Sequence, residues 1–127
     1  MDVFTHCDID MELCGIPIEI MEKSAKVQLK TTDRMGVDSH GLVHGGFIFG
    51  VADYAAMLAV NHPNVVLGSS DVRFLKPVRI GEVVIAEAKV IQSMGKKRIV
   101  HVEVFKEPQL IFDGTFTCFV LDHHVLS

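Results

Sequence analysis

Asp53 is the residue best suited to chemistry, because it is the only charged side chain in the run from Gly45 to Val60. The run reads GGFIFGVADYAAMLAV, which is apolar on every side and predicts a helix buried in a core. A carboxylate without a partner is costly in such a place, and burial favours its protonated form. Asp53 is therefore either satisfied by hydrogen-bond donors or kept as an acid or base.

A second chemical feature lies just before this helix, in the segment HGLVHGG at residues 40–46. The amides of Gly45 and Gly46 have no acceptor within a helix that begins there, and they lie at the positive end of its dipole. Glycine also lets a carbonyl group approach the backbone closely. Donors placed in this way stabilise the oxyanion of an acyl-transfer reaction. The alternative is that the two glycines only begin the helix.

The spacing of these two features has a consequence for any site that uses both. Asp53 lies eight residues after Gly45, which at ~1.5 Å per residue is about 12 Å along the helix axis. A hydrolytic site that uses both must therefore combine two subunits. Gly46, Gly50, Asp53 and Met57 are spaced so that they share one helical face. The two glycines on this face permit close approach of another chain or a ligand.

The elements that position these residues follow an α+β pattern. A short helix is predicted over residues 5–13, capped by Thr5, and the long buried helix over about 44–61. The strand candidates after the long helix are joined by short turns, which is typical of an antiparallel sheet. Gly114 in the last of them is predicted to mark a bulge or bend rather than a break. We expect a curled sheet of five to six strands around one helix. The strands are expected at 18–21, 25–30, 65–75, 82–91, 98–105 and 110–121, and the functional loop at 31–43.

Composition narrows the class of protein. The 127 residues predict one domain, 1–127, and a hydrophobic content of 49% is easiest to place in a subunit interface. The net charge of −4, with no basic face, argues against nucleic acid as a partner. The N-terminus lacks the pattern of a signal peptide, and no charge-free run reaches the ~20 residues of a membrane span. We therefore expect a cytoplasmic oligomer that does not bind membranes.

Neither the cysteines nor the histidines predict a metal site. Cys7, Cys14 and Cys118 lack a CxxC spacing, so we expect three reduced thiols rather than a disulfide framework or a zinc site. His40 and His44 are separated by Gly41 and precede the helix proper, so their spacing gives no shared face.

Several motifs together resemble a known family: HGG opening an apolar helix, Asp53 nine positions after His44, RFLKP at 73–77, and Gly81-Glu82. The chain is similar to the hotdog-fold acyl-CoA thioesterases, within their phenylacetyl-CoA thioesterase-like branch. The resemblance implies sheets of two subunits paired edge to edge, in a homodimer or a tetramer of two dimers, with sites at the dimer interface. It further implies Asp53 as general base for water, or less readily as nucleophile, and the Gly45 amide as oxyanion donor.

The same resemblance assigns the supporting residues. His44 would hold the geometry of the loop, and coenzyme A would enter as part of the substrate, with no separate cofactor. Many relatives carry an asparagine six residues before the histidine, where this chain has Asp38. A second carboxylate near Asp53 would raise the pKa of one of the two, giving an acid–base pair or a poorly tuned site. The candidates for substrate binding are Gly46 and the basic residues Arg73, Lys76 and Arg79. The alternative for the basic residues is that they are only solvated, as exposed basic residues more often are.

A second resemblance keeps a non-enzymatic hypothesis open. Segments 69–74, 83–90 and 111–116 resemble the ligand-binding domain of malonyl-CoA-sensing repressors, hotdog proteins that bind an acyl-CoA without cleaving it. Other branches of the fold match less well, because the DxxG loop at 33–36 lacks its usual followers and no dehydratase-type histidine loop is recognisable. The sequence thus predicts an acyl-CoA thioesterase, with a non-catalytic acyl-CoA-binding regulatory protein as the alternative.

Overall fold

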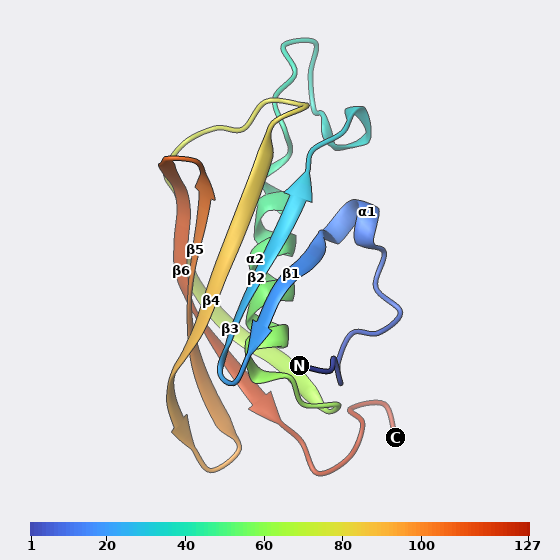
Figure 1. The fold of residues 1–127 in the computed structure, drawn as a ribbon, viewed down its shortest axis with the longest axis vertical. Helices are drawn as coiled ribbons and strands as arrows, with labels where there is room; N and C mark the ends of the chain where they lie inside the picture. Colours follow the sequence, from blue (N-terminus) through green and yellow to red (C-terminus); the bar gives the residue numbers. More distant parts are fainter.

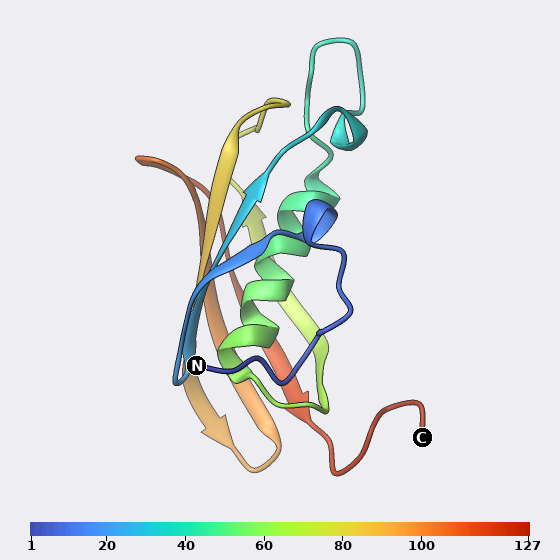
Figure 2. The same cartoon turned by 45° about the vertical axis from the view of Figure 1, so that its right-hand side comes forward.

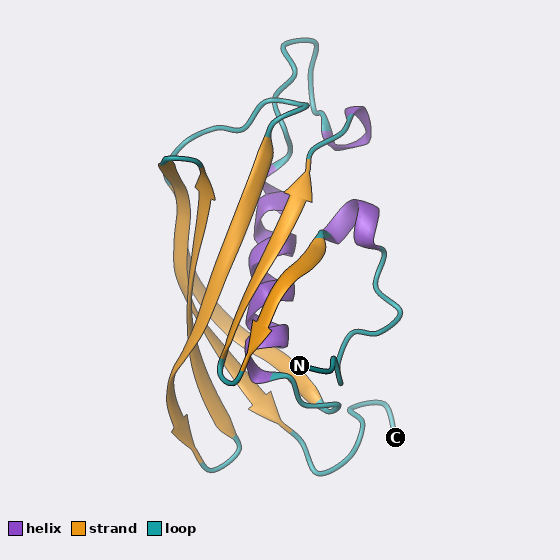
Figure 3. Cartoon of the chain, in the orientation of Figure 1, coloured by secondary structure: helices purple, strands orange, loops and turns teal.

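Six antiparallel strands curl around the helix α2 (Gly45–Val60), as Figures 1 and 3 show. The structure, a computed structural model, describes residues 1–127. The strands lie in the order β1-β2-β4-β5-β6-β3, so β1 and β3 form the two edges of the sheet. The predicted α+β fold is confirmed. The other elements are α1 (Met11–Cys14), β1 (Ile16–Met21), β2 (Ser24–Lys30), a 3-10 turn (Asp33–Met35), β3 (Val65–Phe74), β4 (Val83–Met94), β5 (Lys97–Lys106) and β6 (Gln109–Val120).

Helix α2 is apolar all round because the sheet covers most of its surface. Alternate residues of β2, β4, β5 and β6 point inward and are fully buried against it, which is the two-residue period of a half-buried strand. The helix ends at Asn61, whose left-handed backbone lets its amide donate to Met57 O at 2.8 Å. None of the helices has the length and apolar character that crossing a bilayer demands.

The predicted short N-terminal helix is present, but it begins later and is shorter than the expected 5–13, because helix α1 spans Met11–Cys14. Asp10 begins it, accepting hydrogen bonds from the amides of Glu12 (2.9 Å) and Leu13 (3.1 Å). Residues 1–9 instead form an irregular arm that crosses the lower end of α2 in Figure 2. Asn61 holds this arm, because its Oδ1 accepts from the Phe4 amide and its Nδ2 donates to Asp2 O, both at 2.8 Å. These contacts prevail because the segment THCDID contains mostly weak helix formers.

The pairing between strands is irregular in β1 but regular around Gly114 in β6. In β1, Pro17 lies on an edge, and the pairing with β2 shifts register between Pro17 and Glu19. Strand β6 continues through Gly114 without a break, as predicted, and it has no bulge there, because the pairing of Gly114 with Val72 and Val102 is continuous. Glycine is needed there for space, since a Cβ would lie 2.5 Å from Val72 Cγ1 and within 2.8 Å of a backbone oxygen of β3.

The loop between β2 and α2 projects beyond the sheet at the top of Figure 1 and returns to begin the helix. An isolated bridge between Gly36 and Val43 closes it into a narrow hairpin, and a second bridge joins Leu42 to Arg79. The His44 amide donates to the carbonyl of buried Met35 at 2.8 Å. These bonds fix the backbone that leads into Gly45.

Candidate functional site

The first turn of α2 leaves two backbone donors free. The amides of Gly45 and Gly46 have no acceptor in the chain, and the first helical bond runs from the Phe47 amide to His44 O at 3.0 Å. His44 precedes the helix in an extended conformation, and its side chain forms no capping hydrogen bond. The positive end of α2 is therefore available to an anion or a polarised carbonyl oxygen.

Two aromatic side chains flank these glycines. A Cβ placed on Gly45 would lie 3.2 Å from the Phe74 ring, and one on Gly46 would lie 2.8 Å from His44 Nε2. Phe74 is itself packed edge-on against Phe112, with 5.0 Å between ring centroids. Any larger residue at 45 or 46 would push these rings, so the glycines keep the rings close to the helix start.

A cleft of about 330 Å³ opens beside Gly45. It lies between the helix start and the segment that follows β3, and most of its lining is apolar, including Leu42, Ile48 and Phe74. Lys76 is the only charged residue that lines it. The cleft thus offers an apolar wall, two free amides nearby and one cation.

One side of α2 is less covered than the rest and consists of Gly46, Gly50 and Asp53; we call it the open flank. Gly46 is exposed and the other two are half-buried, whereas Met57, predicted on the same face, is buried. One carboxylate oxygen of Asp53, Oδ1, is buried without a hydrogen-bond partner. Burial raises the pKa of Asp53 from 3.8 to about 6. Such a group is a stronger base than an exposed aspartate and is still largely ionised at neutral pH.

Asp38 is occupied within its own loop. Its Oδ1 accepts hydrogen bonds from the amides of His40 (2.9 Å) and Leu42 (3.3 Å), and its side chain is exposed. Within one chain, the pKa of Asp53 is raised by burial and not by Asp38.

The three basic candidates differ in how they are held. Arg73 forms a two-pronged ion pair with Asp113, at 3.1 Å from Nε to Oδ1 and 3.0 Å from Nη2 to Oδ2. The two residues are directly paired across β3 and β6, a register that the sequence alone does not reveal. Lys76 and Arg79 are exposed, and neither side chain has an ion pair. Lys76 and Arg79 are therefore freer than Arg73 to meet a ligand phosphate.

The remaining polar groups do not form a second reactive centre. All three cysteines are free thiols. Burial, with a smaller contribution from the charge of Asp53, raises the pKa of the Cys118 thiol to about 12, so this thiol stays protonated. No group of three or more histidine, cysteine, aspartate or glutamate side chains is arranged to hold a metal ion.

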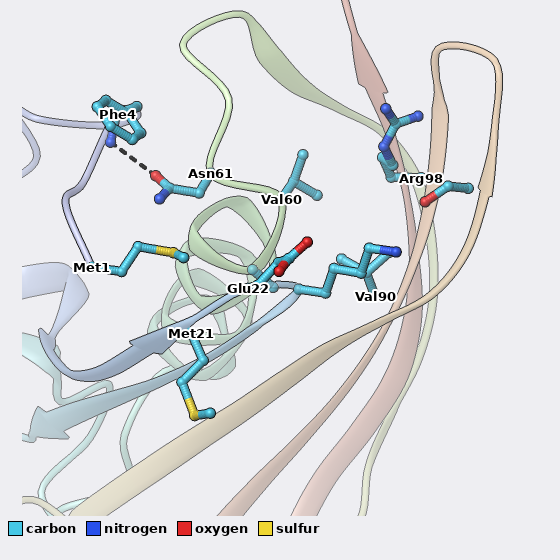
Figure 4. Close-up of a pocket in the computed structure, with 11 residues that line it drawn as sticks. Met1, Phe4, Met21, Glu22, Val60, Asn61, Val90 and Arg98 are labelled. Carbon is cyan, nitrogen blue, oxygen red and sulfur yellow. Dashed lines mark hydrogen bonds between the residues drawn. The ribbon is translucent and has the colours of Figure 1, made fainter.

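A separate cleft of about 290 Å³ lies at the C-terminal end of α2 and is drawn in Figure 4. Met21, Val60, Val90 and Arg98 line it, together with the N-terminal arm, and Asn61 is bound to the arm there. It shares no residue with the cleft at Gly45.

Sequence reasoning missed the contact between Phe74 and Gly45. Its only trace in the sequence is an exposed apolar pair, Phe74-Leu75, between the charged residues Arg73 and Lys76. Spacing could not show that the end of β3 meets the start of α2.

The fold thus combines a curled sheet around one helix with free glycine amides at the helix start and a lone carboxylate about two turns further on. A family model, the Thioesterase superfamily, matches residues 40–112, more than half of the chain. The chain belongs to the thioesterase superfamily, and its fold is the hotdog fold.

Solved structures of similar proteins agree with this placement. An uncharacterized protein from Pyrococcus horikoshii is 53% identical, with a TM-score of 0.99 over 100% of this chain and 98% of that one. A mutant of the phenylacetic acid degradation protein PaaI from Thermus thermophilus is 30% identical, with a TM-score of 0.80 over 87% of this chain and 97% of that one.

Two curated relatives are longer proteins. The methylthioribose-1-phosphate isomerase of Aquifex aeolicus is 53% identical over 96% of this chain, which spans only 27% of that protein. The transcription factor FapR of Caldanaerobacter subterraneus subsp. tengcongensis is 25% identical over 88% of this chain and 56% of its own length. The chain thus spans about a quarter of the first relative and about half of the second.

Proposed function

We propose that the protein is an acyl-CoA thioesterase, with Asp53 as general base and the Gly45 amide as oxyanion donor. The observation that carries the proposal is the combination of a buried carboxylate oxygen without a partner and an unpaired amide at the helix start. A buried carboxylate oxygen without a donor is costly to leave unsatisfied, and the free amide lies at the positive end of the helix dipole. Membership of the thioesterase superfamily supports the same reaction class.

The reaction assigns one task to each group. Asp53 takes a proton from a water molecule, whose oxygen attacks the thioester carbonyl carbon. The negative charge that develops on the carbonyl oxygen is stabilised by the Gly45 amide at the positive end of α2. The carbon–sulfur bond then breaks, and the proton held by Asp53 neutralises the coenzyme A thiolate. The products are a carboxylic acid and free coenzyme A.

The distance between the two groups requires a second copy of the chain. Helix α2 is continuous from Gly45 to Val60, so the two groups lie about 12 Å apart along its axis. Each site would pair Gly45 of one subunit with Asp53 of another. The edge strand β3, ten residues long, has unpaired backbone groups through which two sheets could join. His44 would fix the loop, Asp38 would hold its turn, and Lys76, Arg79 and Arg73 would face the phosphates of coenzyme A.

The activity is tested by following thiol release from acetyl-, octanoyl- and phenylacetyl-CoA. Replacing Asp53 with asparagine removes the base with little change in volume, and we expect kcat to fall by roughly 10²–10⁴-fold. Binding of an S-alkyl-CoA thioether, which cannot be hydrolysed, should change far less. Undiminished turnover in Asp53→Asn would overturn the proposed mechanism.

Co-expression of two inactive variants tests the shared site. Gly45→Pro removes the amide at a helix position whose backbone tolerates proline, although its side chain would also displace the Phe74 ring. Asp53→Asn removes the base. A mixed dimer holds one intact pair and one doubly defective pair. Random pairing should therefore restore about a quarter of the native activity, because half of the dimers are mixed and each has one working site of two. Activity no higher than that of either parent would show that the two residues do not act across subunits.

The alternative is a regulatory protein that binds an acyl-CoA without cleaving it. The similarity to the transcription factor FapR favours this candidate. Its expected result is a rise in melting temperature with acyl-CoA, without thiol release and with no effect of Asp53→Asn on turnover.

A further inference from the structure

Gly50 is the only glycine of the chain that the fold does not explain. Of the ten glycines, four have a positive φ and five others would bring a Cβ within 3.4 Å of a neighbour. Gly50 has neither feature, and a Cβ placed on it would meet nothing within 4 Å. The first group is Gly15, Gly41, Gly81 and Gly95, with Gly15 also crowded, and the second is Gly36, Gly45, Gly46, Gly68 and Gly114.

A glycine at this position weakens the helix. Gly50 lies in the interior of α2, where glycine is less stable than alanine because it loses more backbone freedom on folding. Packing within the chain does not require a glycine there, because an added Cβ would meet nothing within 4 Å. The empty space over Gly50 therefore points to something outside the chain that occupies it.

The surroundings indicate what that occupant is. Gly50 lies three residues before Asp53, so the two are neighbours on the helix surface. Phe49, the residue before Gly50, is half-buried, and its ring packs on Phe116 with 5.5 Å between centroids. Asp53 Oδ1 has no donor within the chain. A molecule over Gly50 would thus lie next to the Asp53 carboxylate on the helix surface.

We propose that Gly50 determines the size of the acyl group, because the carbon atoms next to the thioester carbonyl pass through the empty space over it. This rests on the proposed function of the same site. The space selects acyl groups bulkier than acetyl at the carbons next to the carbonyl, and a side chain at residue 50 would exclude them. Gly46, beneath the His44 ring, has no such space.

The test compares Gly50→Ala and Gly50→Leu with the native protein on acetyl-, butyryl- and octanoyl-CoA. One misplaced methylene group in an apolar pocket changes kcat/KM by roughly 10–200-fold. For Gly50→Leu we expect a loss of about 100-fold or more with octanoyl-CoA, and a much smaller loss with acetyl-CoA. Gly50→Ala should show the same order with smaller losses. The matched control is Asp53→Asn, which should lower activity equally for all three substrates.

Folding and assembly are measured in the same variants. Gly50→Ala should raise the melting temperature by about 2–4 °C, because alanine favours the helix. Sedimentation velocity should give the same assembly for all variants. Dissociation of the assembly in Gly50→Leu would mean that a second chain fills the space. Either that result or a loss of activity that is equal for all acyl lengths would overturn the proposal.

Binding separates this proposal from the proposed function. S-ethyl-CoA and S-octyl-CoA thioethers bind without being hydrolysed, so their affinities report on the space even if the native protein releases no thiol. We expect Gly50→Leu to weaken the binding of S-octyl-CoA at least about tenfold more than the binding of S-ethyl-CoA. An equal loss of affinity for both thioethers would refute the role of Gly50, whereas absence of thiol release alone would refute only the hydrolysis.

Discussion

The cost of burying the Asp53 carboxylate predicts an unusual dependence of stability on pH. The folded pKa of about 6 is higher than the ordinary value of 3.8, so the folded state binds the proton more tightly than the unfolded state. Stability is therefore greatest where both states are protonated, and it falls as the pH rises through the interval between these two values. Asp53→Asn has no titrating group at this position and should lack this fall.

The size of the effect follows from the two pKa values. At about 1.4 kcal/mol per pKa unit, the shift from 3.8 to about 6 corresponds to about 3 kcal/mol in full. Roughly 1 kcal/mol of this is already present at pH 4.5, so the difference in unfolding free energy between Asp53→Asn and the native protein should grow by about 2 kcal/mol between pH 4.5 and pH 7.5. Most of the change should fall below pH 6.5.

Urea unfolding at fixed protein concentration across this pH range provides the measurement. Taking the difference between two proteins cancels the other titrating groups, including His6, whose pKa is lowered by burial. Asp53→Ala serves as a second variant. The alanine and asparagine variants can differ in absolute stability, but their differences from the native protein must share the same pH dependence. A difference that stays constant from pH 4.5 to pH 7.5 would refute the assignment of a raised pKa to Asp53.

Three further predictions concern other parts of the chain. Gly114→Ala should destabilise the protein by about 1–3 kcal/mol in urea unfolding, because the new Cβ meets the β3 backbone. The same change at Gly50 should stabilise it. Changes of the same sign in the two unfolding free energies would contradict the packing argument. Lys76→Ala should raise KM for acyl-CoA by roughly 3–10-fold at low salt, but leave KM for the matching acyl-pantetheine, which lacks the phosphates, unchanged. Asn61→Gly keeps the left-handed backbone but removes both bonds to the arm, so amide exchange at Phe4 should accelerate at least about tenfold; unchanged exchange would mean that other contacts hold the arm.

Most of the fold could be predicted because periodicity reflects burial directly. The continuous apolar run located the long helix to within one residue at each end, and alternation of Val27 and Leu29 with Lys26 and Gln28 located β2. These patterns depend on which side of an element faces the core, which is a local property of the sequence.

Other features depend on contacts between distant residues, which no local pattern contains. The arm at residues 1–9 is not helical, and Asn61, more than fifty residues away, binds the backbone of its first part. Gly114 lies in a regular ladder because Val72 crowds it from the neighbouring strand. The candidate site divides in the same way. The sequence alone identified Gly45 and Asp53 as candidates, but the pairing of Arg73 with Asp113 depends on the register of β3 and β6.

The two edges of the sheet differ in a way that limits how copies of this chain could aggregate. On β1, Pro17 lacks an amide hydrogen and the adjacent register shift breaks the row of hydrogen-bonding groups. A further strand therefore finds no regular ladder on that side. Growth by sheet addition would stop once β3 is paired, because the newly exposed edge would again be β1. Pairing through β3 alone would thus protect the molecule against open-ended fibres, although half of its residues are hydrophobic.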